Sequence, residues 1–192
     1  MARYGMAFDY KLCINCKACE VACKEENGVD LGAKNHRLWI VSKEPEGDFW
    51  KLDRSTVEFM PRQCNHCEHP LCLEACDQKA ISITDKGIVK IDKRLCELAQ
   101  LCMSACPYGA IHTDERANVA DKCTFCYDTR LSQGKTTTAC QITCPSKVRI
   151  FGDLDDPKSE ISQVLKAREY FTLKPEKKTK PKLFYLKGRI NS

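Results

Sequence analysis

The feature that most constrains this chain is its cysteine content: 15 of 192 residues, arranged in four short groups. The groups are Cys13, Cys16, Cys19 and Cys23; Cys64, Cys67, Cys72 and Cys76; Cys96, Cys102 and Cys106; and Cys123, Cys126, Cys140 and Cys144. At about 8% cysteine, a short chain approaches the level typical of folds built around cysteine chemistry. We therefore expect an interior organised around these side chains.

Composition argues against three other classes of protein. Residues 1–12 have neither the charged nor the apolar region of a secretory signal, and an odd number of cysteines cannot pair completely into disulfides within one chain. The apolar runs fall far short of the roughly 18 residues that a membrane span needs, so we expect the chain not to cross a membrane itself. The net charge of +5 indicates a nucleic-acid partner only weakly.

The groups resemble copies of one repeated unit. Group three has only three members, and the position at which the repeat predicts a thiol is Ala99. Between groups two and three, apolar and polar residues alternate over 81–84 and 88–91, which predicts a β-hairpin with Gly87 at a positive φ. Residues 17–26 are compatible with a short helix.

The spacing of group one points to a particular metal chemistry. A C-x2-C-x2-C run brings three thiolates to one loop, which suits the several iron corners of a cubane cluster, and the fourth cysteine of such a run serves a neighbouring cluster. Structural zinc usually takes two separated C-x2-C pairs, so groups two and four alone would leave zinc open. Groups one and three favour iron–sulfur, because triple spacing serves no purpose for one ion.

Other candidate residues receive plainer interpretations. Every cysteine belongs to a group, so no lone thiol remains as a candidate nucleophile. We expect the histidines to lie beside the metal centres or on the surface rather than to bind metal. They are His36, His66, His69 and His112. In the cysteine-free stretch 32–59, we expect one or two strands, with Trp39, Phe49 and Trp50 packing.

The chain resembles a known family. The four groups, the run KCTFCYDTRLSQGKTTTACQITCP at Lys122–Pro145 and the ending PKLFYL at Pro181–Leu186 are similar to iron–sulfur electron-transfer subunits of molybdopterin oxidoreductases, of the polysulfide, thiosulfate and dimethyl sulfoxide reductase type. The resemblance implies an α+β fold of two ferredoxin-like lobes with an inserted β segment and an extended C-terminal tail. The expected boundaries are 1–31 with 115–155 for the first lobe, 32–59 for the insertion, 60–114 for the second lobe and 156–192 for a C-terminal extension and partner-docking tail.

The family's ligand pattern implies four clusters. The first three are of the [4Fe–4S] type, held by Cys13, Cys16, Cys19 and Cys144; by Cys23, Cys123, Cys126 and Cys140; and by Cys64, Cys67, Cys72 and Cys106. The fourth has only Cys76, Cys96 and Cys102, with Ala99 at the non-ligating position. We expect a [3Fe–4S] cluster there, the alternative being a [4Fe–4S] cluster with a non-protein ligand. Asp77 follows Cys76 where the family usually has proline, which puts the local turn in question.

The resemblance also implies a function. The chain is expected to have no catalytic residues and to carry electrons between a molybdopterin (Mo or W) catalytic subunit, nearest the first cluster, and a membrane quinone-reactive or cytochrome partner, nearest the fourth, in anaerobic respiration. It is expected to lie peripherally at the cytoplasmic membrane on the periplasmic face, with the cytoplasm as the alternative. A subunit of a formate dehydrogenase or hydrogenase complex and a zinc-stabilised interaction module remain open. No nucleic-acid partner is expected.

Overall fold

The computed structural model describes residues 2–32, 35–43 and 57–188. Its strands are β1 (Tyr4–Phe8), β2 (Leu38–Lys43), β3 (Glu58–Gln63), β4 (Ile81–Ile83), β5 (Val89–Ile91), β6 (Ile111–Asp114), β7 (Val119–Lys122), β8 (Arg149–Asp153), β9 (Tyr170–Phe171) and β10 (Leu183–Leu186). Its α-helices are α1 (Ala18–Asn27), α2 (Leu71–Glu74), α3 (Leu101–Ala105), α4 (Ala139–Ile142) and α5 (Glu160–Ala167). The predicted α+β class is confirmed. None of the helices in these ranges combines the length and apolar character needed to cross a membrane.

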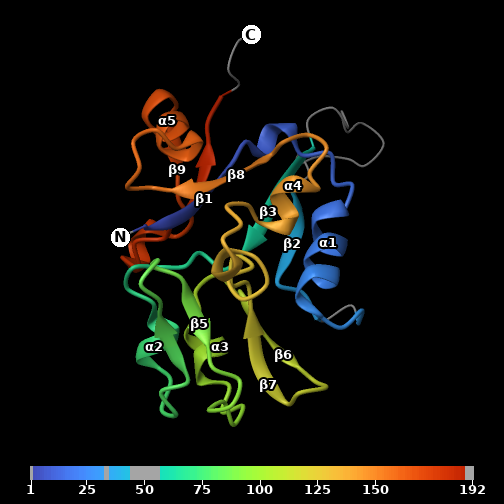
Figure 1. The fold of residues 1–192 in the computed structure, drawn as a ribbon, viewed down its shortest axis with the longest axis vertical. Helices are drawn as coiled ribbons and strands as arrows, with labels where there is room; N and C mark the ends of the chain where they lie inside the picture. The colour runs from blue at the N-terminus through green and yellow to red at the C-terminus, as the bar shows by residue number, and fades with distance from the viewer. Residues whose placement is uncertain (1, 33–34, 44–56, 189–192) are drawn as a thin grey trace.

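Both ends of the chain build the largest sheet. Its strand order is β8-β1-β10-β9, with β1 antiparallel to β8 and parallel to β10. Figure 1 shows these strands with α5 in the upper part of the view, together with α1 and α4, while α2, α3 and β4 to β7 lie below. Strands from the early and late parts of the chain thus lie side by side, and the middle of the chain forms a separate region of hairpins and short helices.

Three antiparallel hairpins complete the fold: β2 with β3, β4 with β5, and β6 with β7. The hairpin predicted around Gly87 is confirmed, because Ile81 pairs with Ile91 and Gly87 has a φ of +70°. The helix predicted over 17–26 is α1, which ends at the left-handed Gly28, whose N–H bonds to the carbonyl of Lys24. Alternating apolar and polar residues around Gly87 were sufficient to predict the hairpin, and a run of helix-compatible residues was sufficient to predict α1.

The inserted segment is described in part. It contributes β2 and leads into β3, and Trp39 packs against the main apolar core, as expected for a packing role. Phe49 and Trp50 lie outside the described residues.

The prediction of an extended C-terminal tail is wrong for the described part of residues 156–192. This segment folds back as α5, β9 and β10, and β10 lies inside the main sheet between β1 and β9. Leu183, Tyr185 and Leu186 are fully buried, and Phe184 packs beside Ile161. A continuous apolar run is typical of a strand covered on both faces, and the run at 183–186 is such a strand rather than a docking peptide.

Tyr185 provides a test of this role. Its ring packs on Phe171 and Phe8, and its hydroxyl donates to the carbonyl of Pro61 at 2.7 Å. Tyr185→Phe should lower the free energy of unfolding by about 1 kcal/mol through the lost hydrogen bond, and Tyr185→Ala by about 3–5 kcal/mol through the cavity it leaves. Anaerobic urea denaturation followed by circular dichroism measures both. Equal stability of all three proteins would mean that β10 does not pair in solution.

Candidate metal centres

All fifteen cysteines lie in the described part of the chain, and none of them forms a disulfide. Three of the four predicted ligand sets each surround a cavity. One cavity is lined by Cys13, Cys16, Cys19 and Cys144. Another is lined by Cys64, Cys67, Cys72 and Cys106. The last is lined by Cys76, Cys96 and Cys102 together with Ala99. The structure therefore brings together residues that are up to 131 positions apart, as between Cys13 and Cys144.

The grouping of the thiols suits a cluster better than a single ion. The three cavities are of nearly equal size, about 20 Å³ each. Four thiolates on one zinc ion lie only about 3.8 Å from each other, because Zn–S bonds are about 2.3 Å long and tetrahedral. Within residues 2–32, 35–43 and 57–188, no three or more His, Cys, Asp or Glu side chains are grouped as one metal ion would require.

The remaining set, Cys23, Cys123, Cys126 and Cys140, is buried where α1 packs on α4. The amide of Asn27 lies 3.7 Å from the Sγ atoms of both Cys23 and Cys126, which joins α1 to the loop after β7. Cys123 and Cys140 are close enough to Cys23 to disfavour its thiolate electrostatically. These four side chains therefore also form one group.

Left-handed backbone positions shape the cysteine loops. Asn15 and Lys17 flank Cys16 with φ values of 55° and 61°, and Leu98 and Gln100 flank Ala99 with φ values of 56° and 60°. The two loops share this pattern, and Cys16 and Ala99 are both exposed at the same position. Ala99 therefore occupies the site of a cysteine in the backbone repeat, as the sequence predicts.

The turn after the last cysteine of three groups is also repeated. Lys79, Gly109 and Lys147 each follow a cysteine by three residues, have a positive φ and donate their N–H to that cysteine's carbonyl oxygen. The turn at Cys76 forms although Asp77 replaces the proline expected there. Asp77 therefore does not disturb the position of the Cys76 side chain.

Backbone amides point at sulfur atoms. The N–H groups of His66, Phe125 and Val148 donate to Cys64, Cys123 and Cys144 at 3.5, 3.4 and 3.4 Å, and the N–H of Ala120 donates to Cys96 at 3.3 Å. Hydrogen bonds to sulfur stabilise its charged form and are one of the factors that set the potential of a cluster.

Burial opposes ionisation of these thiols when they stand alone. The pKa of Cys67 is raised to about 11 and that of Cys72 to about 12. Burial is the main cause of both shifts, and the neighbouring Cys64 contributes to them. Burial and the nearby Cys23 and Cys140 likewise raise the pKa of Cys123 well above its usual value. The thiolates needed for metal binding are therefore stable only when a cation compensates them, and metal binding must release protons.

The four histidines lie in different surroundings. His66 is fully buried, accepts the N–H of Val89 at Nδ1 and stacks on Phe125 with the ring centroids 3.9 Å apart. Burial and the nearby Lys122 hold its pKa well below the usual range, so the ring is neutral. It lies between the second and third cysteine sets, since Phe125 and His66 each bond to a cysteine of their own motif. His36 stacks on His112, and His69 is exposed.

Sequence reasoning missed the polar residues that surround the second set. Arg37 makes a buried bidentate ion pair with Asp121, with both N–O distances 2.8 Å, and donates to Asn27 Oδ1 at 3.0 Å. This network fixes the Asn27 amide that faces Cys23 and Cys126. Neither Arg37 nor Asp121 belongs to a cysteine motif, so no pattern in the sequence marked them.

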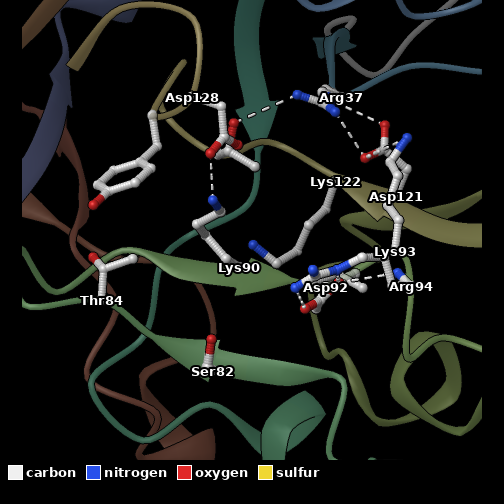
Figure 2. Close-up of a pocket in the computed structure, with 13 residues that line it drawn as sticks. Arg37, Ser82, Thr84, Lys90, Asp92, Lys93, Arg94, Asp121, Lys122 and Asp128 are labelled. Carbon is white, nitrogen blue, oxygen red and sulfur yellow. Dashed lines mark hydrogen bonds and ion pairs between the residues drawn. The ribbon is translucent and has the colours of Figure 1, made fainter. Parts of the chain in front are cut away.

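Another cleft, lined mainly by charged and polar side chains, has no cysteine in its lining (Figure 2). Figure 2 shows that its charged groups face one another: Arg37 bonds to Asp121, and Lys90 bonds to Asp128 at 2.5 Å. Arg94 on Asp92 lowers the pKa of that carboxyl to about 2. The cleft is thus a set of internal ion pairs.

Comparison with known proteins agrees with the cysteine geometry. Residues 55–154 match the family model of the 4Fe-4S dicluster domain. The chain is 42% identical over 184 residues to the protein NrfC of Escherichia coli K12, which covers 95% of this chain and 79% of NrfC. It is 37% identical over 191 residues to one of the chains of the polysulfide reductase of Wolinella succinogenes, which covers 97% and 95% of the two proteins. It is also 37% identical to one of the subunits of the tetrathionate reductase of Salmonella typhimurium, over 96% of this chain and 72% of that one.

The chain belongs to the family of iron–sulfur electron-transfer subunits. It is a non-catalytic redox subunit of a reductase complex, as the sequence predicted, and its cysteines bind iron–sulfur clusters of the 4Fe-4S kind. Iron–sulfur clusters supply one-electron chemistry when bound. The protein supplies thiolates, backbone N–H donors and a dry environment.

Removal of iron should unfold most of this subunit. The buried thiols lose the cation that compensates them, and metal-binding free energy in such small domains is largely folding free energy. Anaerobic treatment with a strong iron chelator and reductant should abolish the visible absorbance and most of the far-ultraviolet circular dichroism, and iron with sulfide should restore both. A chain that keeps its dichroism without iron would contradict this account.

Proposed function

We propose that this subunit passes electrons through four iron–sulfur clusters between a molybdopterin (Mo or W) catalytic subunit and a membrane quinone-reactive or cytochrome partner in anaerobic respiration. The observation that supports this best is the grouping of all fifteen cysteines into four sets, three of four residues and one of three, with none left over. The relatives named above, from polysulfide and tetrathionate reductases, are consistent with such a complex.

The proposed ligand sets are those that line the three cavities, together with the set around Asn27. We propose that they lie in the order first, second, third and fourth, in two ferredoxin-like lobes formed by residues 1–31 with 115–155 and by 60–114. Cys19 of the first set is beside Cys140 of the second. Cys123 of the second set is beside Cys64 of the third. Cys72 of the third set lies in α2, and Cys76 of the fourth set follows it by four residues, beyond the end of that helix. Each set is thus adjacent to the next, which is the arrangement that electron transfer along a chain requires.

The fourth set is proposed to hold a [3Fe–4S] cluster. Alanine offers no donor atom, and Ala99 is exposed, so the iron at that corner would face water without a thiolate. Loss of one iron and one thiolate changes cluster type and net charge, two of the factors that set the reduction potential. A higher potential at this end suits exchange of electrons with a quinone.

Ala99→Cys tests this assignment. The backbone around Ala99 already matches that around Cys16, so the new thiol should bind without rearrangement. The iron content should rise from about 15 to about 16 atoms per chain, and the low-temperature electron paramagnetic resonance signal of the oxidised [3Fe–4S] cluster should disappear. Ala117→Cys, in the exposed turn between β6 and β7, is the matched alanine-to-cysteine control and should change neither. A natural protein with about 16 irons and no such signal would overturn the assignment.

Exposed apolar side chains support docking at both ends of the proposed chain of clusters. Ile14 is 62% exposed in the loop of the first set and Val21 66% exposed on α1, while Leu95 and Leu101 are 52% and 45% exposed beside Cys96 and Cys102 of the fourth set. Such residues are unusual beside cofactors unless another surface covers them. We propose that the catalytic subunit binds over the first set and the membrane partner over the fourth, at the periplasmic face of the membrane.

Interruption of the third set tests the electron path. In the intact complex, Cys67→Ser should reduce substrate reduction driven by a quinol analogue at least tenfold, because electrons must pass the third cluster. Reduction driven by a dye that reaches the catalytic subunit directly should be retained. Ser132→Ala, on the surface, is the control. Retention of quinol-driven reduction in Cys67→Ser would show that the third set does not lie on the path.

A further inference from the structure

Arg149, at the start of β8, is buried among cysteines of two different sets. It is 3% exposed. Its Nη2 lies 3.6 Å from the Sγ of Cys19 in the first set, and its Nη1 lies 3.8 Å from the Sγ of Cys140 in the second. One guanidinium therefore touches a proposed ligand of each cluster.

The other partners of Arg149 are neutral. Its Nη1 donates to Gln63 Oε1 at 2.7 Å and lies 3.7 Å from Met6 Sδ, and the guanidinium carbon is 4.9 Å from the centroid of the Phe8 ring. Each of these contacts holds the side chain in place without compensating its charge.

Other poorly exposed arginines of the described chain differ in this respect. Arg37 pairs with Asp121, Arg130 with Glu26 and Arg168 with Asp9. Within the described residues, no carboxylate lies in ion-pair contact with Arg149. A buried charge without a counter-charge is strongly unfavourable. Its counter-charge must therefore come from sulfur.

A guanidinium stays protonated in proteins, so Arg149 carries its charge at this buried position. Its contacts with Cys19 and Cys140 favour the thiolate forms of both cysteines.

The backbone repeat shows that this cation is specific to one pair of sets. Arg149 follows Cys144 by five residues, just after the Val148 N–H that bonds to Cys144. The residues five positions after Cys106 and Cys76 are Ile111 and Ile81, which are buried and apolar. Packing alone is satisfied by isoleucine at this position, so here the repeat places a charge beside the first and second sets only. A different cation, Lys122 of β7, lines the cavity of the third set.

We propose that Arg149 is the shared counter-charge of the first and second clusters and raises the reduction potentials of both. Reduction adds negative charge to a cluster, and a fixed cation in contact with its ligand sulfur stabilises the reduced form more than the oxidised form. Because the same cation serves two clusters, it also weakens the repulsion between them when both are reduced. This inference rests on the proposed ligand sets.

The test is a redox titration monitored by electron paramagnetic resonance on the intact subunit. Arg149→Met keeps much of the apolar stem and removes the charge. Gln63→Glu keeps Arg149 and places a carboxylate at its Nη1. Both variants should lower the reduction potentials of the first and second clusters. We expect the one-electron equilibrium constant to change at least tenfold, which corresponds to about 59 mV. The fourth cluster should not change. Arg149→Lys keeps the charge and should lower the potentials less than Arg149→Met does.

The outcomes separate the two proposals. A natural protein without four clusters would refute the proposed function. Four clusters with unchanged potentials in Arg149→Met and Gln63→Glu would overturn the role of Arg149 alone. If either variant loses the first two clusters, Arg149→Lys decides: retention of the clusters supports the role of the charge, and equal loss shows that the shape of arginine, not its charge, is required.

Discussion

The burial of many thiols beside one another is the constraint on which this fold depends. Thiolates in a dry environment lack hydration and repel one another. The raised pKa values of Cys67, Cys72 and Cys123 show that ionising these thiols is unfavourable in the protein alone. Iron removes this penalty by binding the thiolates. Secondary structure around the cysteine groups is accordingly short, with α2 and α4 only four residues each, because loops must aim side chains at a centre rather than pack on each other.

Charge is balanced in two separate ways around these centres. Carboxylates pair with Arg37, Arg130 and Arg168. Arg149 contacts Cys19 and Cys140 instead of a carboxylate of the described residues. Backbone amides provide a third, uncharged contribution, since four of them donate to sulfur. The protein thus combines hydrogen bonding from the backbone with a buried charge at the junction of the first and second sets.

The sequence predicted the elements whose signals are local. Gly87 marked the β4–β5 hairpin, Gly28 marked the end of α1, and the repeat identified Ala99 as the position without a thiol. It did not predict that Leu183–Leu186 would pair with β1, because an apolar run carries no information about its partner strand. Arg149 was equally hidden: only comparison with Ile81 and Ile111 in the folded repeat shows that an apolar site has become charged.

The main sheet has a consequence for biosynthesis. With the proposed ligands, the third and fourth sets are complete once Cys106 has left the ribosome, whereas the first two wait for residues 140–144. Strand β1, although it is made first, stands without its parallel neighbour until Leu183–Leu186 have been translated. Cys13, Cys16 and Cys19 therefore wait for Cys144 while the residues between them are translated, and the cell must protect these nascent thiols from oxidation until then.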